Sequence, residues 1–388
     1  MGKAFRAAFR REIAFLKGSA LDRAMLFLMP AILLALVSFE LAGGVMRDLP
    51  IAVVDTDGSA ISRELTRRLD SAPGLSVAAT PDDMMAAEKL VRARKVYAIV
   101  ALSPQMTRDA LRGDTGAVTI LYNASYSTPS GGVVRAVEEV VRSYAATLAG
   151  QSTAAIAGPG AIRPPPVAAR TSVLFNPQGS YELQLVGLLW PAILHLIFMV
   201  AIVSALGREL RDGTIGAWLG ALSRSDAVAE VAGKIAPYLL VFTAWGIIAN
   251  AYLSWFRGWP IEGSATMIFF GYIAMYLAYV GMAALVVGLT RSMAQSLSVA
   301  GIFAGASFAF SGAIFPIESA SAFARWWSLA LPYTAFVKLW AEQYVMGTDM
   351  AYSMRQIWVM LGFFAVGSLI GIPRYIAAAR LPSTWGKR

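Results

Sequence analysis

Residues 263–290 read GSATMIFFGYIAMYLAYVGMAALVVGLT, Arg291 follows, and residues 292–317 read SMAQSLSVAGIFAGASFAFSGAIFPI. Apart from Arg291, this block contains no charged side chain. A helix that crosses the hydrocarbon core of a bilayer needs about 20 mostly apolar residues. The block is long enough for two such helices, so the chain is expected to turn at Arg291. This stretch predicts an integral membrane protein.

Four other apolar runs extend the pattern to six predicted transmembrane helices, namely 24–46, 183–207, 235–256 and 356–373. The first run lacks a clear small-x-small cleavage site and is long for a signal peptide, so we expect it to remain as a helix. Only 15% of the residues are charged, against roughly 25% in soluble proteins. This composition argues against a soluble enzyme, a disordered chain and a nucleic-acid-binding protein.

Basic residues are concentrated beside one end of the predicted spans. Fifteen Lys and Arg, against six acidic residues, lie in the N-terminal segment, the segment after the second span, the turn at Arg291 and the tail. The short segments on the other side hold four basic residues. The positive-inside rule therefore predicts that both termini are cytoplasmic. The same excess accounts for the net charge of +9, so no nucleic-acid partner is expected.

The first 17 residues predict an amphipathic helix. Phe5, Phe9, Ile13 and Leu16 are expected on one face, with Lys3, Arg6, Arg10 and Lys17 opposite. A basic helix with a Phe-rich face is typical of a segment lying in the membrane interface, so membrane lipid is an expected partner. Packing of this helix on protein is the alternative, and the two are compatible.

Residues 47–181 carry ordinary charge density and alternate strand and helix patterns. Strands are expected at 50–54, 75–79, 96–102 and 118–122, and helices at 59–69, 82–94, 104–112 and 130–148. A linker is expected at 153–167, where Gly and Pro cluster. The sequence thus predicts an α-helical integral membrane protein of six transmembrane helices with an inserted extracytoplasmic α/β domain.

The predicted organisation divides the chain at the ends of these segments. Its parts are a cytoplasmic interfacial helix (1–22), the first transmembrane helix (23–46), the periplasmic domain (47–181), transmembrane helices two to six (182–377), which include a coupling loop (208–234) and an outer re-entrant region (316–350), and a cytoplasmic tail (378–388).

No catalytic motif is present: phosphate-binding loop, nucleophile elbow, zinc-protease and dinucleotide fingerprints are all missing. With no cysteine and a single histidine, neither a thiolate nor a multi-histidine metal centre can form. Placing a polar side chain in the hydrocarbon core costs free energy, so Glu40, His195 and Asn250 are candidates for a substrate pathway. Their alternatives are plainer: Glu40 snorkels at the outer interface, and His195 bonds to a neighbouring helix rather than relaying protons.

Two small-x-x-x-small pairs allow close approach of helices. Gly301 and Gly305 are candidates for packing between two protomers, and Gly367 and Gly371 form the other pair. Packing within one chain is the alternative for either pair.

The segment 208–234 is the most informative polar region. Its four basic and four acidic residues interleave with Trp218, it contains Gly213-Thr214 as a turn signal, and Ser223 and Asp226 predict a helix cap. A short, charge-mixed helix with an exposed aromatic is typical of an element that docks a partner. A merely solvated loop is the alternative.

In this region the sequence resembles the permease subunits of type-2 ABC exporters. The resemblance covers about 170–375, and the α/β insert matches the subgroup with a large periplasmic domain in position and size. Leu189-Trp190-Pro191 stands where that subgroup often has Pro-Gly. The matching motifs are Glu209, Gly213-Thr214, Gly233-Lys234 with Pro237-Tyr238, Phe310-Ser311-Gly312, Phe315-Pro316, Leu331-Pro332 and Asn176-Pro177.

The resemblance implies the membrane subunit of an exporter in a bacterial inner membrane, working with a dimer of ABC ATPase subunits and a second permease copy, either identical or a paralogue. ATP and Mg²⁺ would be bound by the ATPase and no cofactor by this chain. A periplasmic adaptor protein and an amphiphilic drug or lipid substrate are further expectations. Residues implied to couple to the ATPase are Glu209, Arg211, Gly213, Thr214, Trp218, Gly233 and Lys234, and Phe310 and Phe315 join the candidate pathway. The alternative function is a membrane sensor or scaffold whose α/β domain binds a ligand; a membrane enzyme ranks third.

Overall fold

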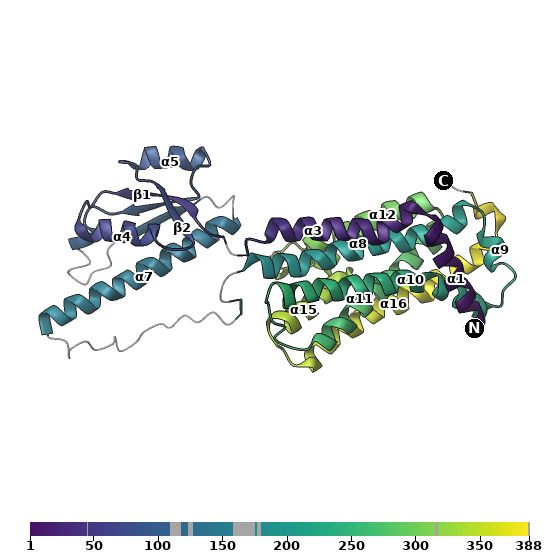
Figure 1. The fold of residues 1–388 in the computed structure, drawn as a ribbon. Coiled ribbons are helices and arrows are strands. Elements are labelled where there is room, and N and C mark those ends of the chain that lie inside the picture. The colour runs from purple at the N-terminus through teal and green to yellow at the C-terminus, as the bar shows by residue number, and fades with distance from the viewer. Residues whose placement is uncertain are drawn as a thin grey trace. The chain divides into compact units, whose positions relative to one another are not determined.

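The computed structural model describes residues 1–44, 46–108, 118–122, 127–157, 175–176, 180–314 and 317–386. The chain divides into two compact units, drawn in Figure 1. One unit comprises Met1–Gly44 and Phe175–Arg388, and the other comprises Val45–Leu174.

The first unit contains six helices that are long and apolar enough to cross a membrane, counted over the described residues. This confirms the predicted six-helix membrane protein. The first span combines α2 (Ala20–Arg23), η1 (Ala24–Leu28) and α3 (Met29–Leu41); the others are α8 (Tyr181–Arg211), α10 (Arg224–Ala251) continued by η4 (Tyr252–Phe256), α11 (Ala265–Thr290), α12 (Met293–Gly305) with α13 (Ser307–Phe310), and α16 (Met350–Ala378).

The expected turn at Arg291 is present. Arg291 ends α11 in the left-handed conformation, with φ +53°, and the side chain of Ser292 caps the following helix α12. The two apolar halves of residues 263–317 are therefore separate spans.

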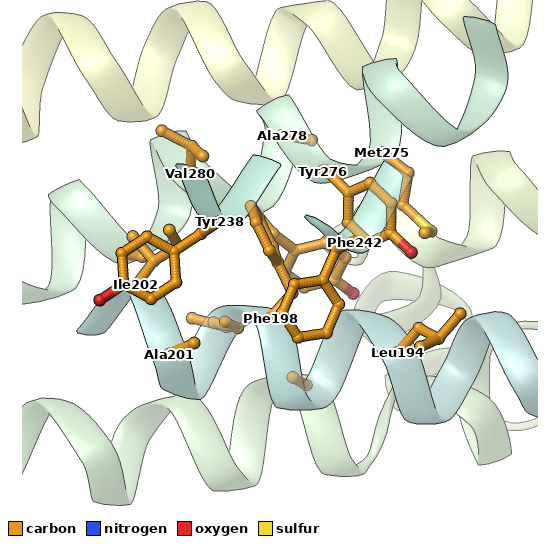
Figure 2. Packing of buried hydrophobic residues seen from close by; sticks show 14 of the residues in the cluster. Leu194, Phe198, Ala201, Ile202, Tyr238, Phe242, Met275, Tyr276, Ala278 and Val280 are labelled. Atoms are coloured by element: carbon orange, nitrogen blue, oxygen red, sulfur yellow. The ribbon is translucent and has the colours of Figure 1, made fainter. Parts of the chain in front are cut away.

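Helix α8 is the most buried of the spans, because 78% of its most apolar 18-residue stretch is buried. Side chains of α8, α10 and α11 interdigitate there, as Figure 2 shows for Phe198, Phe242 and Tyr276. Phe198 lies with its ring centroid 5.3 Å from that of Phe242 and 4.8 Å from that of Tyr276. Aromatic contacts of this kind bury large areas and fix the relative positions of the three spans.

Between α13 and α16 the chain forms four short helices: η5 (Ile317–Ser319), α14 (Ala322–Leu329), α15 (Pro332–Trp340) and η6 (Ala341–Val345). Helix α15 is buried along almost its whole length and contacts α11 and α16. The chain thus folds back among the spans within the segment expected to be re-entrant, 316–350.

The N-terminal helix α1 (Gly2–Gly18) packs on α10. Its buried residues are Ala8, Glu12 and Leu16, whereas Phe5 is 37% exposed. The helix therefore packs on protein, through a face centred on Glu12 rather than on the Phe-rich stripe. The sequence had left this alternative open. The C-terminal end forms η7 (Pro382–Thr384).

The second unit is built on a four-stranded sheet in the order β2-β1-β3-β4. Strand β1 pairs in parallel with β2 and β3, and β4 pairs antiparallel with β3. The strands are β1 (Leu49–Asp55), β2 (Leu75–Ala79), β3 (Ala98–Leu102) and β4 (Val118–Tyr122). Helices α4 (Ala60–Asp70) and α7 (Ser127–Ala157) cover one face of the sheet and form the main core with it. Helix α5 (Met84–Arg92) covers Val54 and Ile99 on the other face of the sheet.

This arrangement confirms the inserted α/β domain. Two expectations for its elements need comment. The helix predicted at 104–112 lies partly outside the described residues, and only 106–108 are described as helical. The linker predicted to start at 153 is wrong for 153–157, because α7 continues to Ala157 through alanines, which favour helix.

Candidate functional site

The polar segment between the second and third spans is mostly helical. Helix α8 continues to Arg211, a turn follows, α9 (Ile215–Leu219) makes a short helix, and α10 begins at Arg224. The segment predicted as the coupling loop, 208–234, thus turns at the expected Gly213-Thr214, and its residues outside 212–223 belong to α8 and α10. Gly213 has φ +69°, a backbone region that glycine enters without a steric penalty. Ser223 accepts a hydrogen bond from the Asp226 N–H, which confirms the predicted cap.

A buried ion network joins α1, α8 and α10 next to this turn. The Lys234 side chain is only 1% exposed, and its Nζ lies 2.6 Å from Glu12 Oε2 and 2.7 Å from Glu209 Oε1. Arg208 Nη2 lies 2.7 Å from the other oxygen of Glu12, to which the Tyr238 hydroxyl also donates at 2.6 Å. These two bases and two acids balance, so each buried charge has a counter-charge, without which burial is strongly destabilising. Arg11, 3.4 Å from Glu209, and Asp22, 3.8 Å from Arg208, extend the network at its edge.

Glu12, Arg208 and Tyr238 are missing from the residues predicted to form this site. A signal for Glu12 was present in the sequence. Glu12 is the only acidic residue of α1, and it lies four residues from both Ala8 and Leu16 on the same helical face. Arg208 and Tyr238 could not be separated from other flanking basic and aromatic residues by pattern alone.

Trp218 covers the network from α9. It is 8% exposed, so the expectation of an exposed aromatic is wrong. Its indole N–H donates to Glu230 Oε2 at 2.8 Å, and the Arg11 guanidinium lies 4.3 Å from its ring centroid. The physical reason is that the Trp218 ring fills the space beside Lys234, whose Nζ is 5.2 Å from the ring centroid.

Two glycines allow neighbouring segments to contact this cluster. A Cβ on Gly233 would lie 2.3 Å from the carbonyl oxygen of Phe5, so α1 and α10 touch through their backbones. A Cβ on Gly216 would lie 2.1 Å from the ring of Trp385. The Gly386 N–H donates to the Leu210 carbonyl at 3.0 Å. Helix α1 therefore packs on α10, and the end of the described chain packs on α9.

The opposite side of the turn is exposed, and it holds the remaining predicted residues Arg211 and Thr214. Arg211 donates to both oxygens of Asp212, at 2.8 and 3.1 Å, and this hydrogen bonding lowers the pKa of Asp212. Thr214 Oγ1 donates to Glu209 Oε2 at 2.5 Å. The exposed turn is thus connected to the buried network by one hydroxyl.

The candidate pathway residues are not gathered into one site. His195 is buried between the rings of Tyr279 and Tyr333, each 4.6 Å away, and its Nε2 lies 3.3 Å from the Ala304 carbonyl of α12. The expected bond to a neighbouring helix is therefore present. Glu40 is exposed in the last turn of α3.

Asn250 and Phe310 lie in other parts of the unit. Asn250 lines a cavity of about 310 Å³ between α10 and α11, which no other candidate pathway residue lines. Phe310 is half-buried, with its ring centroid 6.4 Å from that of Phe323. Phe315 lies outside the described residues.

The two glycine pairs behave differently. A Cβ at Gly371 would lie 2.3 Å from the Leu285 nitrogen, and one at Gly367 would lie 2.4 Å from the Gly281 carbonyl carbon, so this pair packs α16 on α11. A Cβ at Gly301 or Gly305 would meet no atom within 4 Å, and both glycines are exposed on α12. Packing within the chain therefore explains the second pair and leaves the first open.

Chemically, the network has no group placed for catalysis, and the described residues contain no cluster of three or more acidic, His or Cys side chains suited to a metal. What the arrangement can do is hold α1, the end of α8 and α10 together beside an exposed turn.

Comparison with known families gives a match over most of the chain. The family described as ABC-2 family transporter protein matches residues 23–372. No curated protein and no solved structure shows a significant match.

Proposed function

Because this chain belongs to the ABC-2 transporter family as a membrane permease, we propose that it is the transmembrane subunit of an ATP-binding cassette exporter. It moves an amphiphilic, drug-like or lipid-like substrate out of the cytoplasm or the inner leaflet. ATP and Mg²⁺ are bound by a separate dimer of ATPase subunits, and two permease copies form the pathway. Both termini are cytoplasmic and the α/β domain is periplasmic, in agreement with the distribution of basic residues.

The observation that carries this proposal is the rigid connection between the exposed turn and three helices. Glu209 and Lys234 join α8 to α10, and Glu12 joins both to α1. A force applied to the turn by a closing ATPase therefore moves the ends of the second and third spans as one body. A solvated loop, or a scaffold without a moving partner, would not require four buried charges that connect helices at this position.

Within this proposal the predicted coupling residues have two roles. Arg211, Gly213 and Thr214 form the surface that meets the ATPase. Glu209, Trp218, Gly233 and Lys234 lie beneath it and transmit the movement, since their side chains or backbone are buried in the packing of α1, α8 and α10.

The test uses the complex isolated through a tagged permease, with transport measured in inverted vesicles and ATP hydrolysis measured with and without substrate. Gly213→Val is expected to insert and dimerise normally but to lose transport and substrate-dependent ATP hydrolysis. A left-handed conformation costs a non-glycine residue about 1–2 kcal/mol, which corresponds to a roughly 5–30-fold shift in the turn's equilibrium. Arg211→Glu is expected to weaken ATPase binding through its exposed charge.

Gly258→Val is the matched control, because Gly258 also has positive φ, +73°, but follows the third span at its other end. Full transport by Gly213→Val with the ATPase bound would remove the turn from the coupling path. Failure of any ABC ATPase to co-purify, together with ligand binding by the α/β domain, would favour the sensor alternative.

A further inference from the structure

Helix α1 has a second face that the ion network does not use. Lys3, Arg6, Arg10 and Lys17 are exposed there, and within the described residues none of them forms an ion pair. The single acid of α1, Glu12, is 1% exposed and is occupied by Lys234 and Arg208. The exposed face is therefore uniformly basic.

Apolar side chains border this basic face. Phe9 and Ile13 are only half-buried, although they lie next to the buried face, and Phe5 stacks on Phe9 with centroids 6.3 Å apart. An acidic protein surface would neutralise the charges but leave these rings unused. A bilayer interface takes both, because rings enter the boundary between headgroups and acyl chains while Lys and Arg reach the phosphates.

The connection to the first span places α1 at such a surface. Helix α1 ends at Gly18, Ser19 is extended with φ −95° and ψ 109°, and the first span begins at Ala20. With one residue between them, the helix lies beside the point where the chain enters the membrane. Its docking on α10 then fixes which face it turns away from the protein.

We propose that this basic face of α1, formed by Lys3, Arg6, Arg10 and Lys17, binds the headgroups of anionic phospholipids. Basic residues near an anionic leaflet each contribute roughly a fivefold factor to binding, so three of them contribute a roughly hundredfold factor. The inference concerns lipid binding alone and does not depend on transport.

The chain contains no cysteine, so one introduced cysteine provides a unique labelling site. Ile13→Cys carrying an environment-sensitive NBD dye reports on the apolar border, in full-length protein reconstituted into nanodiscs of phosphatidylcholine with increasing phosphatidylglycerol. We expect a blue shift that grows with the phosphatidylglycerol fraction and reverses at high salt, because screening shortens the range of exposed charges. The same dye at Ser225→Cys, an exposed position in the first turn of α10, should not shift.

Replacement of Lys3, Arg6 and Arg10 by Gln should abolish the response to phosphatidylglycerol. A matched triple change, Arg224→Gln, Arg374→Gln and Arg380→Gln, removes the same charge from exposed positions on α10, on α16 and in the turn after α16, and it should retain the response. Because the replaced side chains of α1 make no ion pair with the protein, the fold is expected to persist, and an unchanged melting temperature would verify this.

Equal spectra in both lipids, or a full response in the α1 triple variant, would overturn the proposal. A shift that appears only when the ATPase subunit is added would also overturn it and assign the basic face to a protein partner.

Discussion

A charged lysine side chain that is almost fully buried is stable only if a counter-charge lies next to it. Lys234 has two carboxylates within 2.7 Å, and Arg208 shares one of them. Four buried charges that sum to zero are tolerated, whereas one or three buried charges are not. The desolvation free energy of an ion is offset only by a close counter-charge. The identity of each member is therefore constrained by the other three.

Glu12→Gln should lower stability strongly, since it leaves Lys234 with Glu209 alone and Arg208 with Asp22 alone, at 3.8 Å. Removing one partner of a buried pair is destabilising by about 3–5 kcal/mol. The double variant Glu12→Gln with Lys234→Met removes one charge of each sign, and it should be more stable than the sum of the single effects implies. Melting temperatures of the detergent-solubilised protein would measure all three variants.

Glu138→Gln is the control for this cycle, because Glu138 is an exposed acid on α7. Strictly additive effects of the Glu12 and Lys234 changes would show that the two residues are not energetically coupled.

Sequence reasoning reached Glu209, Lys234 and Gly233 through their position in a motif but assigned them to a loop. It could not show that Lys234 is buried, because its counter-charge Glu12 is 222 residues away in the chain. A contact at that separation leaves no periodicity in either local sequence. The burial of Trp218 was missed for the same reason, since its neighbour Arg11 also comes from α1.

At the scale of elements, α11 and α16 are joined by a seam of glycines. Gly281 and Gly288 on α11 face Gly367 and Gly371 on α16, with backbone atoms where side chains would otherwise lie. In a membrane, where apolar side chains gain little by leaving lipid, close backbone packing is a main source of helix association. This seam brings the backbones of the two helices into direct contact.

Gly371→Ala is expected to destabilise the protein by about 1–3 kcal/mol, as overpacking does in tightly packed sites. Gly362→Ala on the same helix meets nothing within 4 Å and should be neutral or slightly stabilising. The fraction remaining monodisperse after heating, measured by size-exclusion chromatography, compares the two. Equal behaviour of both variants would mean that the seam relaxes freely.

Elements of the α/β domain were predicted closely where apolar runs stop at turn residues. Strand β2 was expected at 75–79 and occurs at Leu75–Ala79, and β1 extends the expected 50–54 by one residue at each end. The ends of α7 were less well predicted, because alanine-rich sequence such as 153–157 supports either helix or linker and no local signal decides. The six spans were predictable because length and hydropathy alone define them.

At the scale of the whole molecule, the distribution of Lys and Arg makes a topological prediction. Reporters fused at Ile120 should be outside the cell membrane, and those at Gly220 and Trp385 inside, because fifteen basic residues flank one side and four the other. Paired alkaline phosphatase and green fluorescent protein fusions measure this. An inside signal at Ile120 would contradict the six-span topology.

Assembly makes a second prediction at this scale. Gly301→Leu should weaken the permease dimer and leave membrane insertion intact, because Gly301 is exposed and meets nothing within 4 Å in its own chain. Disulfide crosslinking through Ile302→Cys, a side chain 69% exposed on α12, reports on the dimer. Gly362→Leu, at an open glycine of α16, is the control. Unchanged crosslinking in Gly301→Leu would place the dimer contact elsewhere and leave the Gly301–Gly305 face to lipid.

The ion pair between Glu12 and Lys234 can form only after both residues have been synthesised. Helix α1 leaves the ribosome before α10, and the counter-charge of Glu12 follows 222 residues later. At about 5–20 residues per second this interval lasts roughly 10–45 s. During that time α1 has no docking surface on α10, and an amphipathic basic helix next to an inserting span has the leaflet as its nearest binding surface. The nascent helix α1 therefore binds lipid at first. The face that carries Glu12 leaves the lipid for protein once α10 has been synthesised.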